Sequence, residues 1–292
     1  MIVRLIDGGV EVLAPAKLNL FLEVLSRRPD GYHEIESLMV SVNLHDTLIV
    51  REEDSDAVIL ECDDPRLPTG GENLVVKAAQ RLKAATGCRR GASITLKKVI
   101  PAQAGLGGGS SDAAATLVAL DRIWGLGTSE ARMDAIAGEI GSDVPFFLHA
   151  PSAVCRGRGE RVEAVPVRHP LHFVLVAPEV GVSTAEVYRK LETDHTPRPI
   201  GPVLEALDEG DPGPLGRSLF NRLQHVAEDV RPELARVRDA LAEIVPPFEG
   251  SLMSGSGSAY FGLCRDADAA GRAADLLEPL GLGWVRVVTC GP

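Results

Sequence analysis

The stretch PAQAGLGGGSSDAAATL, residues 101–117, holds four glycines within five positions and then turns into a run of helix-forming residues. A glycine-rich turn that leads into a helix leaves backbone N–H groups unpaired, and the helix dipole adds partial positive charge at the same place. That arrangement binds phosphate. The stretch therefore predicts a phosphate-binding loop that ends near Ser111, followed by a helix over residues 112–124.

The glycines also fit a simpler structure, a tight turn in which Ser111 or Asp112 caps the helix. Four glycines exceed what a turn requires, and each one costs backbone entropy on folding, which favours the phosphate loop. A Walker A loop would need a lysine after the glycines, and a dinucleotide-binding fingerprint would need a third glycine where Ser110 stands. Neither of these two loops fits the sequence.

Length and composition indicate an ordinary globular protein with room for two packed domains. The chain has 292 residues, of which 45% are hydrophobic and 24% charged. Its net charge of −11 argues against a general role on nucleic acid or anionic lipid. An anionic ligand would therefore need a local site.

The cysteines and the N-terminus both suggest a reducing compartment. The five cysteines are odd in number and never spaced as CxxC, which favours reduced, buried thiols over a disulfide framework or a zinc site. Asp7 and Glu11 interrupt the N-terminus where a signal peptide needs an apolar core. We expect a cytoplasmic protein.

Hydrophobic periodicity predicts alternating strands and helices along the chain. Gly87 stands where the first helix should end, and residues 157–170 mix charge, Gly and Pro as in a passage between domains. The predicted strands cover residues 10–25, 37–52, 92–100 and 284–289, and residues 174–184 are predicted to be a strand followed by a loop. The predicted helices cover residues 73–86, 112–124 and 129–140, with further ones near 214–229 and 231–245.

Three motifs of the sequence resemble those of a known protein superfamily. PAQAGLGGGSSDAAA resembles the central phosphate loop of the GHMP kinase superfamily, whose members share a lysine-bearing N-terminal strand and a C-terminal glycine motif. This chain has both, as APAKLNLFL at 14–22 and LMSGSGSAYFGLC at 252–264. The resemblance implies an α+β fold of two domains: an N-terminal β-α-β nucleotide and phosphate-loop domain at 1–160, and a C-terminal ferredoxin-like α+β domain at 161–292.

Within that superfamily the resemblance narrows to the kinases that phosphorylate a cytidine diphosphate-linked methylerythritol in the non-mevalonate isoprenoid pathway. Residues 16–48, which contain DGYHEI, and GSDVPFFL at 141–148 carry this match, whereas residues 185–250 and 265–292 match only loosely. It implies ATP and Mg²⁺ as cofactors, a small-molecule substrate, no nucleic-acid or membrane partner, and a monomer or weak homodimer.

The resemblance also implies a catalytic pair. Asp143 would accept the proton of the acceptor hydroxyl, and Lys17 would hold both that hydroxyl and the carboxylate in position. Asn19, on the same strand face as Lys17, would hydrogen-bond the substrate or the lysine. The plainer alternatives are a helix cap for Asp143, an edge-strand lysine with its head in solvent for Lys17, and a structural hydrogen bond for Asn19.

A cytosine ring calls for aromatic stacking and for a partner that both donates and accepts hydrogen bonds. Tyr32 and His33 supply these side by side, although a hairpin turn with a half-exposed ring is the plainer interpretation of GYH. By resemblance, Tyr188 forms a second aromatic wall, where relatives often have phenylalanine, and Thr184 lies in the same substrate segment.

For the nucleotide, the resemblance implies a site around the glycine loop, with Ser111 also contacting magnesium. Lys97 and Lys98 could each simply be solvated strand residues, and the GSGSA turn at 255–259 would support the site. The implied ATP-binding residues are Asn73, Leu74, Lys97, Pro101, Gly105, Leu106, Gly107, Gly108, Gly109, Ser110 and Ser111.

Two rival functions stay open. Another GHMP small-molecule kinase, such as a homoserine kinase, would share the loops but has no reason to keep DGYHEI. A non-catalytic sensor of nucleotide and sugar should have lost the lysine or the aspartate, and this chain has both Lys17 and Asp143.

Overall fold

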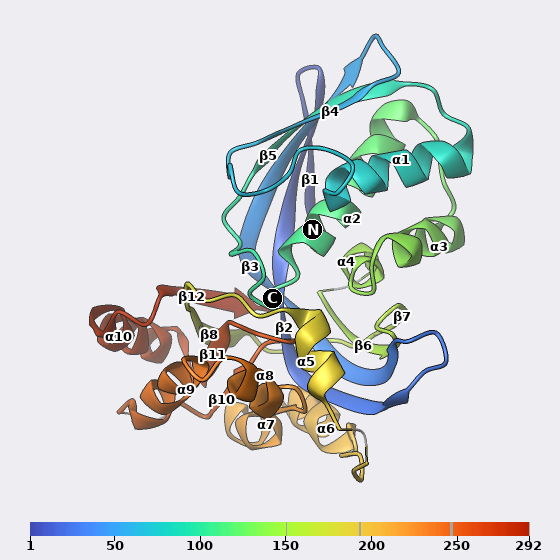
Figure 1. Cartoon of the computed structure of the whole chain (residues 1–292). Helices are drawn as coiled ribbons and strands as arrows, with labels where there is room; N and C mark the ends of the chain where they lie inside the picture. Colours follow the sequence, from blue (N-terminus) through green and yellow to red (C-terminus); the bar gives the residue numbers. More distant parts are fainter. Residues whose placement is uncertain (150, 193, 246–247, 292) are drawn as a thin grey trace. The chain divides into compact units, whose positions relative to one another are not determined.

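The structure is a computed structural model that describes residues 1–149, 151–192, 194–245 and 248–291. The chain folds into two compact units made of interleaved segments (Figure 1). The long strands β2 (Gly9–Arg27) and β3 (His33–Glu53) each contribute to both units. The predicted boundary at residue 160 stays a prediction. Unit 1 comprises residues 1–16, 44–100 and 107–150, and unit 2 comprises residues 17–43, 101–106 and 151–292.

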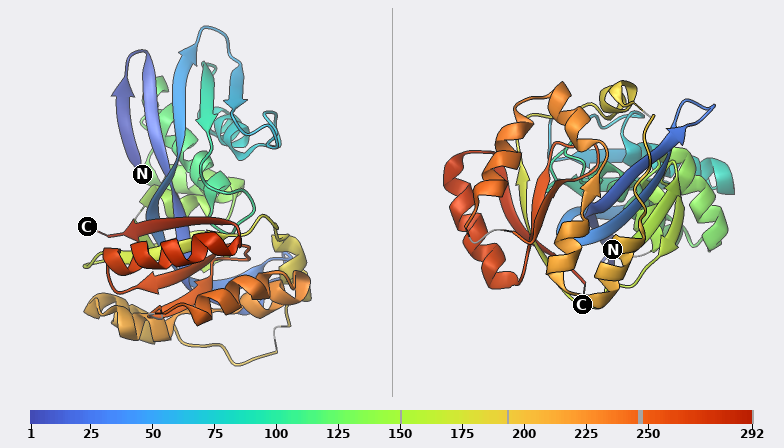
Figure 2. Two further views of the ribbon diagram at one scale, coloured as in Figure 1. Left: turned by 90° about the vertical axis from the view of Figure 1, so that its left-hand side faces the viewer. Right: turned by 90° about the horizontal axis from the view of Figure 1, so that it is seen from below.

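Unit 1 is a sheet with the strand order β1-β2-β3-β5-β4, and its helices all lie on one face (Figure 1, Figure 2). Strand β4 runs parallel to β5, while β1 and β5 are antiparallel to their neighbours β2 and β3. The remaining strands are β1 (Ile2–Ile6), β4 (Val58–Cys62) and β5 (Gly91–Lys97). The helices are α1 (Leu74–Thr86), α2 (Gly108–Trp124), α3 (Glu130–Ile140) and α4 (Val144–His149).

Helix α1 confirms the prediction for residues 73–86 to within one residue. The Asn73 side chain caps it by accepting a hydrogen bond from Val75 N at 2.9 Å, and Gly87 ends it with φ of 73°. Its buried residues recur at the spacing of one helical face and include Val75, Ala78, Ala79 and Leu82.

Helix α2 begins four residues earlier than predicted, at Gly108 rather than at Asp112. Its N-cap is Gly107, with φ of 71°, and no side chain of the described chain caps it. The idea that Ser111 or Asp112 caps this helix is therefore wrong. Small buried residues such as Ala113 and Ala114 let the helix pack closely against α1 and α4.

Unit 2 contains a second, fully antiparallel sheet with the order β10-β11-β8-β12, on which α9 and α10 pack. Its strands are β8 (Leu171–Ala177), β10 (Gly250–Met253), β11 (Tyr260–Cys264) and β12 (Trp284–Cys290). The helices are α5 (Thr184–Lys190), α6 (Gly201–Glu209), α7 (Pro212–Ser218), α8 (Gln224–Val230), α9 (Leu234–Glu243) and α10 (Ala267–Leu277), followed by a 3-10 turn at Glu278–Leu280.

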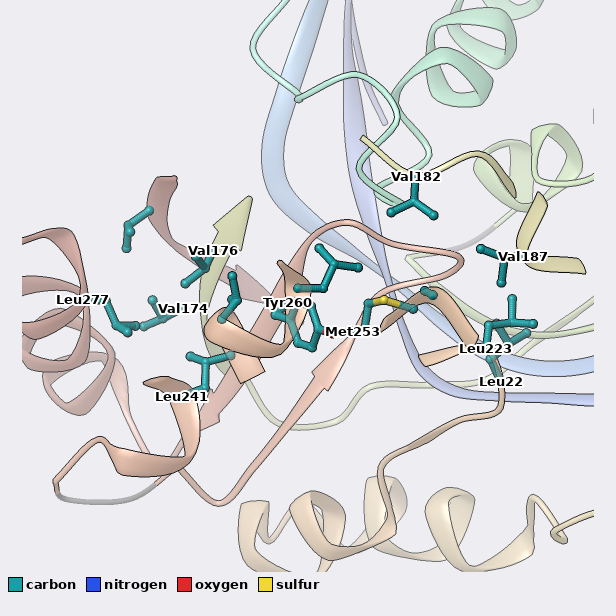
Figure 3. Close-up of a cluster of buried hydrophobic side chains, with 14 of the residues drawn as sticks. Leu22, Val174, Val176, Val182, Val187, Leu223, Leu241, Met253, Tyr260 and Leu277 are labelled. Carbon is teal, nitrogen blue, oxygen red and sulfur yellow. The ribbon is translucent and has the colours of Figure 1, made fainter. Parts of the chain in front are cut away.

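A hydrophobic core joins this sheet to the rest of unit 2 (Figure 3). Val174 and Tyr260 on the sheet contact a cluster that includes Leu277 of α10 and Leu241 of α9, and it extends to Leu22 of β2. The unit-2 part of β3 pairs with β6 (Ser152–Gly157), which pairs with β7 (Arg161–Ala164).

The helical segments predicted near residues 214–229 are present as α7 and α8, but a short strand, β9 (Phe220–Asn221), interrupts the helical pattern between them. Strand β9 pairs in parallel with β2, and Asn221 Nδ2 donates to Met253 O and Gly255 O, both at 2.7 Å. Tertiary hydrogen bonds therefore override the helical pattern at this point.

The five cysteines of the described chain are reduced thiols, and Cys155, Cys264 and Cys290 are buried. Burial raises the pKa of the Cys264 and Cys290 thiols to about 12. Within the described ranges, no helix has both the length and the apolar character needed to cross a membrane.

Candidate active site

The structure explains in different ways why glycine occupies the positions of the predicted phosphate loop. Gly105 and Gly107 have φ of 75° and 71°, and a Cβ on Gly105 would lie 2.1 Å from Ser254 O. A Cβ on Gly108 would lie 3.0 Å from Ile100 Cγ2. Gly109 is exposed, and a Cβ there would meet only Leu74 Cδ1 at 3.5 Å, which is an ordinary contact. The packing of the chain therefore explains three of the glycines and leaves Gly109 unexplained.

Gly109 lies in the first turn of α2, where backbone N–H groups have no intrahelical partner. A side chain at this exposed position would narrow the approach to those N–H groups. Phosphate binding at the start of α2, as predicted from the sequence, would account for a glycine that the fold itself does not require.

The GSD turn of unit 1 lies against the same end of α2. A Cβ on Gly141 would be 3.4 Å from Val144 Cγ2 and 4.0 Å from Ser110 Oγ. Asp143 is half-buried directly before α4. The GSD turn that contains Asp143 thus lies near Ser110 of the loop within unit 1, and the catalytic role of Asp143 stays a prediction.

A buried ion cluster beside the start of α2 was not predicted. Lys98 Nζ lies 2.7 Å from Asp112 Oδ2 and also pairs with Asp46 Oδ2, and the side chains of all three are at most 8% exposed. This arrangement corrects the view of Lys98 as a solvated strand residue. Its partners lie 52 and 14 residues away in the sequence, so no local pattern could have indicated them.

The charges of this cluster shift one another's proton affinities. Burial raises the pKa of Asp112 to about 7, although the positive charge of Lys98 acts in the opposite direction. Burial lowers the pKa of Lys98, but the two carboxylates outweigh this effect and raise that pKa above its ordinary value. The lysine therefore stays protonated.

In unit 2, Lys17 is buried on β2 and is only 3% exposed. Its Nζ donates to Asn19 Oδ1 at 2.5 Å, and Asn19 Nδ2 donates to Ser37 Oγ at 2.8 Å. The alternative of a solvent-directed lysine is therefore wrong. Lys17 and Asp143 belong to different units, and their pairing stays a prediction.

The GSGSA turn of unit 2 surrounds this lysine. Ser254 Oγ accepts from Asn19 N at 3.3 Å and donates to Gly105 O at 3.0 Å. A Cβ on Gly255 would lie 3.1 Å from Lys17 Nζ, so glycine is needed for the close approach. The C-terminal glycine motif thus shapes the surroundings of Lys17 and Asn19.

The aromatic residues predicted to hold a base also lie together in unit 2. The His33 and Tyr188 rings are 5.1 Å apart between centroids, with an angle of 32° between their planes. Tyr32 is 52% exposed, and the Arg158 guanidinium lies over its ring at 4.7 Å. Thr184 Oγ1 lies 2.7 Å from Ser256 Oγ, which joins the substrate segment to the GSGSA turn.

The imidazole of His33 is in the neutral form, which can hydrogen-bond the edge of an uncharged base. Burial, and then the positive charge of Arg27, lower the pKa of His33 from its ordinary value of 6.5. The imidazole is therefore neutral at pH 7, with one donor and one acceptor nitrogen. A neutral imidazole can both give a hydrogen bond to a base and accept one from it.

The surroundings of the other residues that are predicted to bind the nucleotide do not by themselves indicate a binding role. The Asn73 side chain is engaged in capping α1 and also donates to Pro68 O at 2.8 Å. Lys97 is exposed at the end of β5, and Leu74 and Pro101 are half-buried. Residues 101–106 of the loop belong to unit 2 and residues 107–111 to unit 1.

A magnesium site made only by the protein does not fit the described residues. In residues 1–149, 151–192, 194–245 and 248–291, no three His, Cys, Asp or Glu side chains form a metal-binding group. Ser111 Oγ is buried without a hydrogen-bond partner in that part of the chain, so it is available as a single ligand. The residues fit an ion held mainly by nucleotide oxygens and water.

Comparison with known proteins defines the class. The family model described as GHMP kinases N terminal domain matches residues 73–150, and the model described as GHMP kinases C terminal matches residues 203–278. A crystal structure of homoserine kinase from Cytophaga hutchinsonii has a TM-score of 0.78 at 22% identity over 99% of this chain and 96% of its own, which shows a common fold. The predicted two-domain α+β GHMP kinase fold is confirmed.

Relatives with higher sequence identity show which group of GHMP kinases this chain resembles. The 4-diphosphocytidyl-2-C-methyl-D-erythritol kinase of Symbiobacterium thermophilum is 44% identical over 94% of this chain and 98% of its own length. That of Pelotomaculum thermopropionicum is 46% identical over 91% of this chain and 92% of its own. A crystal structure of 4-(cytidine 5'-diphospho)-2C-methyl-D-erythritol kinase has a TM-score of 0.81 at 38% identity, covering 97% and 99% of the two chains.

The chain belongs to the 4-diphosphocytidyl-2-C-methyl-D-erythritol kinase family. The resemblance carried by DGYHEI, GLGGGSSDAA and GSDVPFFL is thereby confirmed. As a GHMP kinase, the protein is an ATP-dependent phosphotransferase.

Proposed function

We propose that this protein transfers the γ-phosphoryl group of ATP to the 2-hydroxyl of 4-diphosphocytidyl-2-C-methyl-D-erythritol. The products are the 2-phosphate and ADP, in a step of the non-mevalonate isoprenoid pathway. The observation that carries the proposal is the paired His33 and Tyr188 rings, which lie in the same unit as the buried Lys17 and Asn19. This combination supports a substrate with a flat base at one end and a reacting alcohol at the other.

Tyr32, His33 and Tyr188 would hold the cytosine. Aromatic rings stack on either face of a base, and the neutral imidazole of His33 matches an edge that has both a donor and acceptors. Thr184 is exposed near this pair and would contact the diphosphate or sugar. A homoserine acceptor has no ring to stack, so these residues support the cytidine-linked substrate over that rival.

The acceptor hydroxyl would be activated by Asp143, with Lys17 holding the oxygen in line with the phosphorus. Phosphoryl transfer depends chiefly on positioning and charge stabilisation, together with an acceptor for the hydroxyl proton. Asn19 accepts a hydrogen bond from the Lys17 ammonium group and is itself held by Ser37 and Ser254, which supports a positioning role for Lys17. The retention of both Lys17 and Asp143 argues against a non-catalytic sensor.

The nucleotide phosphates would bind at Gly107–Ser111, with Gly105, Leu106 and Pro101 shaping the approach. Asn73, Leu74 and Lys97 would lie toward the adenine. Ser111 would hold a magnesium ion, which would supply positive charge that stabilises the nucleotide phosphates.

A substrate panel tests the proposal. Purified protein is incubated with ATP, magnesium and one acceptor at a time: the cytidine diphosphate substrate, homoserine or mevalonate. We expect ADP release only with the first, and a phosphorus resonance that assigns the new phosphate to the 2-position. Comparable ADP release with homoserine, or none with the cytidine-linked acceptor, would overturn the assignment.

A further inference from the structure

Three ionisable side chains from different elements meet beside the first turn of α2. Asp46 comes from β3, Lys98 directly follows β5, and Asp112 lies on α2 itself. All three belong to unit 1, and their side chains are 0%, 8% and 3% exposed. Water therefore cannot screen their charges effectively.

The two carboxylates of this cluster differ in how fully they are hydrogen-bonded. Asp46 Oδ1 accepts from Val99 N at 2.6 Å and from Ile100 N at 2.8 Å, while its Oδ2 pairs with Lys98. Asp112 Oδ2 accepts from Lys98, but its Oδ1 has no partner in the described part of the chain. Two carboxylates thus share one cation.

The cluster lies next to the phosphate-binding end of the helix. A Cβ on Gly108, the first residue of α2, would be 3.4 Å from Asp46 Oδ2. Asp112 follows four residues later, about 6 Å along the helix axis. Negative charge at this distance opposes the binding of an anionic phosphate at the helix start, and the positive charge of Lys98 offsets part of it.

The alternative is that the cluster only stabilises the fold. That role does not explain why the three buried residues are charged rather than apolar. Buried ion pairs seldom stabilise a protein more than well-packed apolar residues of similar volume would. The position of the cluster at the helix start is what a role in phosphate binding requires.

We propose that Lys98 is a positioning residue for the nucleotide, whose positive charge offsets the negative charge of Asp46 and Asp112 so that the start of α2 can accept the phosphates. Lys98 does this without contacting the phosphates itself. The inference rests on the proposed function only in taking ATP as the ligand of this helix end.

Equilibrium binding of AMP, ADP and ATP, measured by calorimetry without acceptor, tests this idea independently of turnover. For Lys98→Met, we expect ATP affinity to fall about ten-fold, with a smaller loss for ADP and the least for AMP, because the repulsion grows with ligand charge. An equal loss for all three nucleotides, or no loss, would overturn the proposal. Failure of the proposed function would appear separately, as absent turnover in the substrate panel.

Asp112→Asn is the matched control, because it removes a negative charge from the same cluster. We expect it to bind ATP at least as tightly as the wild type, whereas a purely structural cluster would lose affinity in both variants. If Lys98→Met does not fold, Lys98→Arg and the charge-balanced double variant Lys98→Met/Asp112→Asn replace it. Both should retain ATP affinity to within about three-fold, and a larger loss in either would count against the proposal.

Discussion

Lys17 Nζ donates a hydrogen bond to Asn19 Oδ1 at 2.5 Å, in a buried part of β2 where the two side chains share one face of the strand. Asn19 is itself fixed by Ser37 and Ser254. The direction of the lysine head group is therefore set before any substrate binds. This preorganisation is the property that a positioning cation in phosphoryl transfer needs.

Lys17→Met should lower kcat by about a hundred-fold or more, because it removes a charge that acts in the transition state. The methionine has similar volume and carries no buried charge, so the melting temperature should fall little. Steady-state kinetics and thermal unfolding measure both. Lys77→Met, an exposed lysine of α1, is the control and should leave both values unchanged. Wild-type kcat in Lys17→Met would exclude a catalytic role for this residue.

The loop glycines should separate into two groups. Gly109→Ala should not lower the melting temperature, since its Cβ has room, but it should raise the KM for ATP about ten-fold by obstructing the helix start. Gly105→Ala should destabilise the fold by about 2 kcal/mol or more, because of its positive φ and the contact with Ser254 O. Unchanged ATP kinetics in Gly109→Ala would contradict this account of the loop.

The sequence predicts a helix well where its period and its ends agree. Helix α1 combines a regular apolar face with Asn73 and Gly87 at its ends, and its bounds are correctly predicted. The start of α2 is predicted four residues too late, because Gly108 and Gly109 have poor helix propensity. Tertiary contacts decide the conformation of such residues.

Glu23 should contribute to stability in a pH-dependent way. Burial alone would raise its pKa, but hydrogen bonds from Arg222 and from the backbone of Arg198 and Val24 outweigh burial and hold the pKa below its ordinary value of 4.5. A lowered folded pKa means that the contribution is fully present above pH 4.5 and is lost as pH falls through the folded value.

Glu23→Gln should therefore reduce the free energy of unfolding by about 3 kcal/mol near pH 7, because it leaves the partly buried Arg222 without its carboxylate. The difference from wild type should shrink as the pH approaches the folded pKa. Denaturant titrations between pH 3 and 7 measure it, with the exposed Glu243→Gln as control. A difference that does not vary with pH would show that the ion pair is not its source.

His33 should make acceptor binding depend on pH. Its lowered pKa keeps the ring neutral above pH 6.5, so the KM for the cytidine-linked acceptor should be constant there and rise as pH falls through the lowered pKa. Arg27→Gln removes one cause of the shift and should move that rise to higher pH. Acceptor KM measured from pH 5 to 8 tests this, and identical profiles in both proteins would speak against His33 as the titrating group.

The sequence indicates which residue types to propose for the site, but it does not indicate their partners. Lys17, Asn19, Tyr32, His33 and Asp143 were chosen from short motifs, and unit 2 does bring the His33 ring to Tyr188, 155 residues later. The pairing of Lys98 with Asp46 had no such signal, because a lysine at a strand end is ordinarily solvated. Single-sequence patterns report on neighbours within a turn or a strand, whereas buried ion clusters arise from the topology of the sheet.

The most direct test of the central claim compares turnover and binding in Asp143→Asn. If Asp143 accepts the proton of the acceptor hydroxyl, this variant should lose about a thousand-fold in kcat while its dissociation constants for ATP and for the cytidine-linked acceptor stay close to those of the wild type. Retention of wild-type kcat in a folded Asp143→Asn protein would contradict the claim.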